Sequence, residues 1–158
     1  IAEDLGIITK DVETLRDNYE LPGMKILQFA FDGNENNPYL PKNIEKENWV
    51  VYTGTHDNAT STSWWNYLDI TIKNHIKDKY KYSNDPSWNL MEIGMSTKAN
   101  LFISPIQDIL SLDDSSRLNT PGTITNNWRW KLNQTLDEID MNLKKYSDLG
   151  NNYGRLSN

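Results

Sequence analysis

Two short, almost continuous apolar runs, Met24–Phe31 and Trp49–Thr53, limit the possible folds of this chain more than any other feature. Strands of a parallel sheet are covered on both faces, so they consist of unbroken apolar residues rather than an alternating pattern. Both runs have the length of a strand, and the second ends at the turn residue Gly54. We therefore expect two buried strands of a parallel sheet.

Segments with helical spacing alternate with these runs. In the first part of the chain we expect the end of a strand at Ile1–Glu3, a helix that Thr9 opens with Val12 and Leu15 on its inner face, the strand Met24–Phe31, a polar loop at Asp32–Asn48 and the strand Trp49–Thr53. In the second part we expect a helix from Thr60 to Ile76 with Trp64, Trp65 and Leu68 facing the core, a break at Tyr80–Pro86, a helix at Trp88–Lys98, a strand at Leu101–Ile106, a loop at Leu110–Gly122 and a helix at Asn133–Asp148. Four strands with intervening helices predict an α/β fold, either an open parallel sheet or half of an eight-stranded barrel.

Composition excludes several classes of function. The net charge of -6 and the pI near 4.9 leave no basic surface for nucleic acid or for an anionic membrane. The 158 residues include no cysteine, which rules out disulfides and thiolate metal sites. No secretory signal and no run long enough to span a bilayer occurs, so a cytoplasmic location is the expectation. A glycine-rich phosphate loop is missing as well, which argues against nucleotide binding.

Two carboxylates follow expected strands and define the candidate site. Glu3 lies at the strand end that opens the chain, and Asp57 follows the strand Trp49–Thr53 beside His56. In a barrel of parallel strands, catalytic groups lie at the carboxyl ends of the strands. Two acids placed in this way, with a histidine beside one of them, predict acid/base chemistry on a sugar. Asp4 is the weaker candidate for the acid, because adjacent residues of a strand face opposite sides.

Six motifs make this prediction more specific. They are IAEDLG at 1–6, LPGMKILQFAF at 21–31, NPYLP at 37–41, YTGTHDN at 52–58, NTPGT at 119–123 and NWRW at 127–130. In this order they closely resemble the C-terminal part of the amylomaltase family, the 4-α-glucanotransferases, and the resemblance extends to Tyr153–Arg155.

The resemblance implies a fold and an activity. It implies that residues 1–158 are the C-terminal portion of a single (β/α)8 catalytic domain, about its last four strands and the helices that follow them. It also implies an enzyme of starch and glycogen metabolism that transfers α-1,4-glucan segments between chains, with retention at the anomeric carbon. Neither a metal nor an organic cofactor is implied.

The resemblance also assigns roles to single residues. Glu3 matches the general acid/base, Asp57 matches the stabiliser of the transition state, and His56 matches a donor to sugar hydroxyls. Asn119 matches a sugar-contacting asparagine, and Asn58 is a further candidate for substrate binding. The family's nucleophile is an aspartate in an Arg-x-Asp sequence, which this chain does not contain. We therefore expect the N-terminal half of the barrel, with the nucleophile, to be absent, and the chain alone to be inactive.

Several of these residues have a purely structural alternative. His56 and Asp57 could form only a satisfied hydrogen-bonded pair in a turn, or they could belong to an Asx turn that caps the following helix. Trp128 and Trp130 could serve either packing or contact with glucan. The aspartates that follow the last expected strand are interpreted as helix caps: Asp108, Asp113 and Asp114.

The predicted function is that of a 4-α-glucanotransferase acting on malto-oligosaccharides or other α-glucans. A related retaining α-glucan hydrolase would use the same carboxylates, and only its products would differ. A carbohydrate-binding module without catalysis is the alternative from another class, although modules of this size are usually antiparallel sandwiches. The expected partners are the glucan substrate and the missing half of the barrel, without nucleic acid or membrane.

Overall fold

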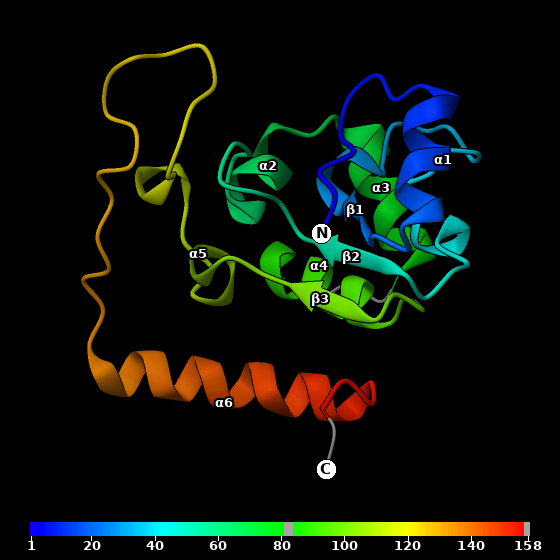
Figure 1. Cartoon of the computed structure of the whole chain (residues 1–158). Coiled ribbons are helices and arrows are strands. Elements are labelled where there is room, and N and C mark those ends of the chain that lie inside the picture. Colours follow the sequence, from blue (N-terminus) through cyan, green and yellow to red (C-terminus); the bar gives the residue numbers. More distant parts are fainter. Residues whose placement is uncertain (81–83, 157–158) are drawn as a thin grey trace.

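A computed structural model describes residues 1–80 and 84–156 of the chain (Figure 1). Its helices are α1 (Lys10–Asn18), α2 (Ser61–Tyr67), α3 (Ile70–Lys79), α4 (Pro86–Met95), α5 (Ile106–Ile109) and α6 (Leu136–Asn152). Its strands are β1 (Gly23–Ile26), β2 (Trp49–Tyr52) and β3 (Leu101–Ile103), and short 3-10 turns are η1 (Leu27–Phe29), η2 (Pro41–Asn43) and η3 (Asp114–Ser116). The expected break at Tyr80–Pro86 includes residues 81–83, which lie outside the described residues.

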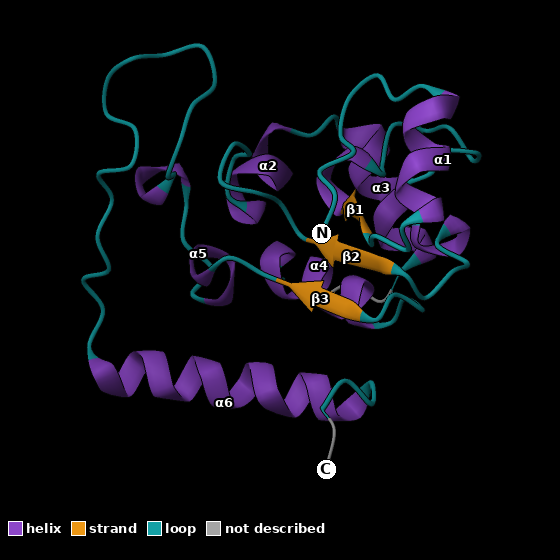
Figure 2. Ribbon diagram, viewed as in Figure 1, coloured by secondary structure: helices purple, strands orange, loops and turns teal. Residues whose placement is uncertain are grey.

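The three strands form one parallel sheet in the order β1-β2-β3 (Figure 2). Ile26 pairs with Tyr52, and Tyr52 pairs with Ile103, so all three strands end at the same edge of the sheet. Val50 and Val51 of β2 are fully buried. The predicted α/β fold with a parallel sheet is confirmed, although Leu101 and Ile103 of β3 are exposed. Ligand sites of such sheets lie at the carboxyl ends of the strands, so the candidate site is sought at that edge.

The prediction of a fourth strand ending at Ile1–Glu3 is wrong, because residues 1–5 have no regular secondary structure. Ala2 N donates to the carbonyl of Pro22 at 2.8 Å, as in a ladder. In a parallel ladder the Ala2 carbonyl would accept in turn from Met24 N, but Met24 N donates to the side chain of Asp4 at 2.7 Å instead. The segment therefore lies along β1 without pairing as a strand.

The run Met24–Phe31 is strand only as far as Ile26 and then tightens into η1. The expected helix from Thr60 to Ile76 is also divided, because Leu68 is extended and Asp69 starts a new helix by accepting from Thr71 N at 2.7 Å. An aspartate after an extended residue is a strong N-cap, which accounts for the division.

The predicted start of the first helix is confirmed, because the helix begins at Lys10 after the N-cap Thr9. Val12 and Leu15 are exposed, so their expected inner position is wrong. The last helix, expected at Asn133–Asp148, spans Leu136–Asn152 and begins after Thr135, whose hydroxyl accepts from Glu138 N in a capping box.

A single large core joins the sheet to α2, α3 and α4. Its buried side chains are Leu27, Ala30, Phe31, Leu40, Ile44, Val51, Trp65, Ile76, Leu90, Ile93 and Ala99. Burial of one such leucine or isoleucine contributes roughly 1.5–3 kcal/mol. Trp64 and Leu68 pack against this core, so the inward placement expected for this helix face is confirmed.

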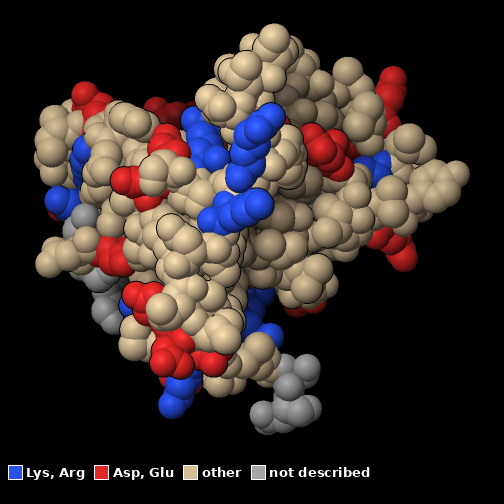
Figure 3. Space-filling view, turned by 90° about the vertical axis from the view of Figure 1, so that its left-hand side faces the viewer, with Lys and Arg blue, Asp and Glu red and all other residues tan. Residues whose placement is uncertain are grey.

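The C-terminal helix packs against α4 and against Phe102 of β3, and the long segment 117–135 connects it to the rest (Figure 1). Tyr146 and Leu149 of α6 pack against Trp88 and its buried neighbours. The guanidinium of Arg155 donates to the carbonyls of Met95, Thr97 and Ala99, which satisfies the end of α4. Figure 3 views the side that carries segment 117–135, where basic and acidic side chains are spread between uncharged surface.

The helices in the described ranges are all too short or too polar to cross a bilayer.

Candidate active site

A cleft of about 330 Å³ lies at the carboxyl edge of the sheet. Three segments that are far apart in the sequence form its walls: the N-terminal segment, the residues around the end of β2 and those after β3. Its lining residues are Glu3, Leu5, Met24, Tyr52, Gly54, Thr55, His56, Asp57, Ile103 and Pro105. The structure thus brings both predicted acids and the predicted histidine into one cavity.

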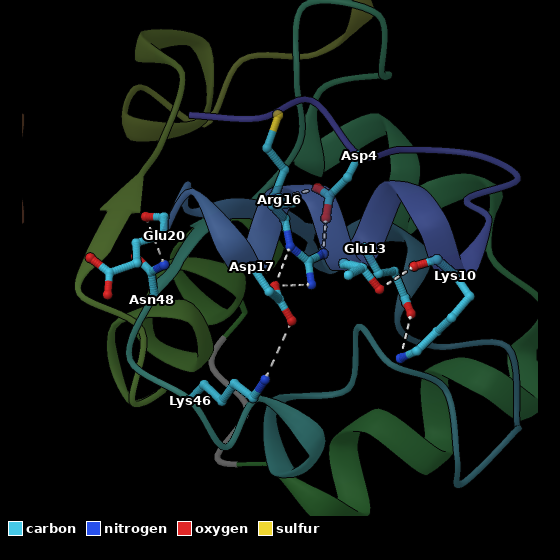
Figure 4. A network of polar contacts seen from close by, with 10 residues as sticks. Asp4, Lys10, Glu13, Arg16, Asp17, Glu20, Lys46 and Asn48 are labelled. Atoms are coloured by element: carbon cyan, nitrogen blue, oxygen red, sulfur yellow. Dashed lines mark hydrogen bonds and ion pairs between the residues drawn. The ribbon is translucent and has the colours of Figure 1, made fainter.

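Glu3 is exposed in this cleft, whereas Asp4 is turned away and buried. Asp4 accepts hydrogen bonds from Arg16 at 2.5 Å and from Met24 N at 2.7 Å (Figure 4). The expectation that Glu3 and not Asp4 faces the site agrees with this geometry. The carboxylate of Asp4 has a structural function, which is to hold the N-terminal segment against α1 and β1.

The ion pair of Asp4 and Arg16 is one part of a larger network (Figure 4). Arg16 also donates to Asp17 at 2.7 and 2.9 Å, and its guanidinium lies 4.6 Å above the ring of Trp49. A Cβ at Gly23 would come within 2.5 Å of an Asp4 oxygen and closer still to Trp49, so only glycine fits there. No local pattern in the sequence indicates this network, because its members come together only in the fold.

The loop after β2 is shaped by Asn58. Its Oδ1 accepts from both the N–H and the hydroxyl of Thr55, each at 2.8 Å, and its own N–H donates to the Thr55 carbonyl at 3.1 Å. This β-turn over residues 55–58 presents His56 and Asp57 at its two central positions. The amide oxygen of Asn58 is therefore committed to the loop, and contact of this residue with substrate stays a prediction.

Gly54, at the start of the same loop, permits a close approach. A Cβ there would lie 2.7 Å from Nε2 of Gln28. The side chain of Gln28 reaches across from the end of β1 and donates to the carbonyl of Ala59 at 2.9 Å. Glycine at the end of β2 is therefore needed for the loop to be held from the neighbouring strand.

Asp57 is held by the distant segment 117–119. Asn119 Nδ2 donates to Asp57 Oδ1 at 2.5 Å, and Arg117 donates to the Asp57 carbonyl at 2.8 Å. His56 Nε2 lies 3.4 Å from the same Oδ1, and the carbonyl of His56 accepts from Asn119 N at 3.1 Å. Three of the predicted site residues, His56, Asp57 and Asn119, are thus in direct contact.

Trp128, whose role was left open, lies beside this group. Its ring centroid is 5.0 Å from that of His56, and 61% of the residue is exposed. Its φ of 60° is rare for a bulky residue, and its N–H donates to the Leu118 carbonyl at 2.7 Å. Trp130 lies elsewhere, in a shallow depression with Leu112.

The three aspartates after β3 all accept hydrogen bonds from backbone N–H groups at helix starts. For two of them the helix is distant in the sequence. Asp113 accepts from Ser115 N at 3.0 Å in its own 3-10 turn. Asp114 accepts from Thr60 N at 2.9 Å, and Asp108 accepts from Ser61 N at 2.8 Å, so both bind the start of α2. The capping interpretation is confirmed, although for Asp108 and Asp114 the capped helix comes earlier in the chain.

The chemical capacity of the cleft follows from its polar groups. It offers two carboxylates and one imidazole next to apolar walls, which suits proton transfer and hydrogen bonding to a polyhydroxylated ligand. Within residues 1–80 and 84–156, no group of three or more histidine or acidic side chains is arranged to hold a metal ion.

Known proteins are similar to this chain in both sequence and fold. A chloroplastic/amyloplastic 4-alpha-glucanotransferase of Solanum tuberosum is 45% identical over 161 residues, which cover 99% of this chain and 28% of the relative. The 4-alpha-glucanotransferase of Thermus thermophilus is 43% identical over 140 residues, which cover 84% of this chain and 28% of the relative. An amylomaltase from Streptococcus agalactiae, solved in complex with acarbose, matches 99% of this chain and 32% of that chain, with a TM-score of 0.88 and 29% identity.

These matches confirm the family that the six motifs indicated. The chain spans about 28% of the length of the curated relatives it matches. The sequence model of the family described as 4-alpha-glucanotransferase matches residues 1–137. The chain therefore belongs to the 4-alpha-glucanotransferase family.

Proposed function

We propose that the natural protein carrying this sequence is a 4-α-glucanotransferase acting on malto-oligosaccharides or other α-glucans. We further propose that residues 1–158 are part of its (β/α)8 catalytic barrel. Family membership, the parallel sheet and the cleft at its carboxyl edge support both statements. The structural neighbour in complex with acarbose supports a saccharide as the ligand of this cleft.

The observation that carries the proposal is the meeting of Glu3 with His56 and Asp57 in one cleft. In a retaining transfer, one carboxylic acid protonates the departing glycosidic oxygen and later takes a proton from the acceptor hydroxyl. Glu3 is exposed in the cleft and is assigned this double role. Asp57 and His56 bind hydroxyls of the sugar ring on which positive charge develops, and such contacts strengthen in the transition state.

A retaining transfer also needs a nucleophile. Glu3 and Asp57 are the carboxylates among the described residues that line the cleft. Since both have other roles in this proposal, the nucleophile is assigned to a part of the protein outside this sequence. The 158-residue chain alone is accordingly proposed to be inactive.

Transfer in place of hydrolysis requires that the acceptor sugar, and not water, reaches the intermediate. The segment 117–128 lies against His56 and Asp57 through Asn119 and Trp128. A wall of this kind, with an exposed indole ring, favours a sugar over water at the cleft.

The net charge of -6 supports the further proposal of an enzyme without nucleic-acid or anionic-membrane partners. A cytoplasmic location, expected from the sequence, stays a proposal.

The test is to incubate the natural protein with maltotriose and separate the products by chromatography. Glucose together with oligosaccharides longer than maltotriose is the expected result, because each transfer shortens one chain and lengthens another. Glucose and maltose alone would replace this proposal with a glucan hydrolase. Binding of maltotriose without any product would replace it with a carbohydrate-binding module.

A further inference from the structure

The carboxylate of Asp108 is a feature that the proposed reaction does not use. The residue is 1% exposed, and no basic side chain within the described ranges forms an ion pair with it. Burial raises the pKa of this carboxyl, while hydrogen bonds from Thr53 and Ser61 act in the opposite direction. A buried carboxylate without a cation is costly, so its place in the molecule requires an explanation.

The hydrogen bonds of Asp108 connect the two ends of one loop. Its Oδ2 accepts from the hydroxyl of Thr53 at 2.6 Å and from the hydroxyl of Ser61 at 2.7 Å. Its Oδ1 accepts from Ser61 N at 2.8 Å. Thr53 directly follows β2 and Ser61 is the first residue of α2, and the loop 54–60 between them carries His56 and Asp57.

Other groups also hold this loop. Gln28 donates from its side chain to the carbonyl of Ala59 and from its backbone N–H to the carbonyl of Thr53, Asp114 accepts from Thr60 N, and segment 117–119 binds the tip. Asp108 differs because one side-chain carboxylate binds both Thr53 and Ser61 and so fixes the distance between the end of β2 and the start of α2. A change of that distance would move the tip of the loop, where the candidate catalytic groups lie.

We propose that Asp108 is a positioning residue, which clamps the two ends of loop 54–60 and thereby orients His56 and Asp57 toward the sugar. The effect of this clamp on activity rests on the proposed function, whereas its effect on the mobility of the loop does not. Residues that orient the groups of a site through hydrogen bonds, without touching substrate, typically contribute about 10- to 100-fold to activity. The clamp therefore acts on the chemical step more than on the binding of substrate.

The kinetic test uses Asp108→Ala, Asp108→Asn and Thr53→Val in the natural protein, with maltotriose as substrate. We expect kcat to fall about 10- to 100-fold in Asp108→Ala, with a change in KM of less than about threefold. Asp108→Asn should recover part of kcat, because an amide still offers one acceptor and two donors to the same three groups. Thr53→Val removes one hydrogen bond at nearly constant shape and should lower kcat by about tenfold.

Asp85→Ala is the matched control. Asp85 caps α4 by accepting from Ser87 N at 3.1 Å and Trp88 N at 3.2 Å, and it also accepts from the hydroxyl of Ser111. We expect this variant to lose thermal stability as the Asp108 variants do, yet to keep kcat within about twofold. The proposal would be overturned if kcat of the control fell as much as kcat of Asp108→Ala. It would also be overturned if Asp108→Ala kept the parental kcat.

A second readout does not depend on activity. Hydrogen exchange of the amides in loop 54–60 should be at least about tenfold faster in Asp108→Ala and Thr53→Val than in the parent, and unchanged in Asp85→Ala. If the parent itself transfers no glucan, the proposed function fails and the exchange rates alone decide on the clamp. Parental exchange rates in both Asp108→Ala and Thr53→Val would overturn the clamp proposal.

Discussion

At the scale of single residues, the orientation of Asp57 depends on a partner 62 positions further along the chain. The side chain of Asn119 donates to the Asp57 carboxylate, and its backbone N–H donates to the carbonyl of His56. One residue therefore holds both members of the pair. Its amide also occupies one of the carboxylate oxygens that would otherwise accept from the sugar, so Asn119 and the sugar hydroxyls share the acceptor capacity of Asp57.

This contact predicts different effects for two substitutions. Asn119→Ala removes the donor and should lower kcat/KM for maltotriose by about tenfold, which corresponds to about 1.4 kcal/mol of transition-state stabilisation. Asn119→Asp places a second anion against Asp57 and should lower kcat/KM by about 100-fold, since repulsion turns the carboxylate away. Steady-state kinetics of the natural protein and of both variants measure the difference.

Asn142→Ala provides the control for these substitutions. Asn142 is half-buried on α6 and donates to the Glu138 carbonyl at 2.8 Å, far along the chain from the cleft. Parental kcat/KM is expected for this variant. Equal activity of Asn119→Asp and the parent would show that the contact with Asp57 has no part in the reaction.

At the scale of elements, Glu35 joins the loop between β1 and β2 to α3. Its carboxylate forms ion pairs with Lys42 of the same loop and with Lys79 of α3 at 2.6 Å, and His75 lies 3.8 Å away. Hydrogen bonds from Lys42 and Lys79 lower the pKa of Glu35 to about 2. The folded protein therefore stabilises the ionised form of Glu35 relative to the unfolded chain.

The sign of the resulting pH dependence follows from the lowered pKa. The stabilisation by Glu35 is complete above its ordinary pKa of 4.5 and is lost as the pH falls through about 2. Glu35→Gln should thus lower the melting temperature at neutral pH, and its difference from the parent should shrink between these two pH values. Thermal unfolding across this range is the measurement, with the exposed Glu45→Gln as control, and a difference that does not change with pH would contradict the assignment.

The elements also show what the sequence alone could predict. The strands β1 and β2 and the starts of α1 and α2 follow from apolar runs and capping residues, which are local patterns. The strand expected at Ile1–Glu3 forms no ladder, because Asp4 accepts from the Met24 N–H that would return the bond. Contacts such as Thr53 with Asp108, 55 positions apart, follow from no local pattern, since they depend on how the strand ends meet in space.

At the scale of the whole molecule, the cleft exists because three segments meet at one edge of the sheet. Glu3, Asp57 and Pro105 come from the beginning, the middle and the last third of the chain, and the parallel register brings them to the same cavity. The motifs predicted which residues belong to the site. Their meeting in one cleft required the fold, and the proposed reaction depends on that meeting.

The most direct test of this account is the activity of Glu3→Gln in the natural protein, with Glu45→Gln as the matched surface control. Loss of the general acid/base should lower kcat/KM for maltotriose by about 10²- to 10⁴-fold, while the thermal stability stays that of the parent. Glu45→Gln should keep full activity. Glucan transfer by Glu3→Gln at the parental rate would contradict the account, because the cleft would then not be where the chemistry takes place.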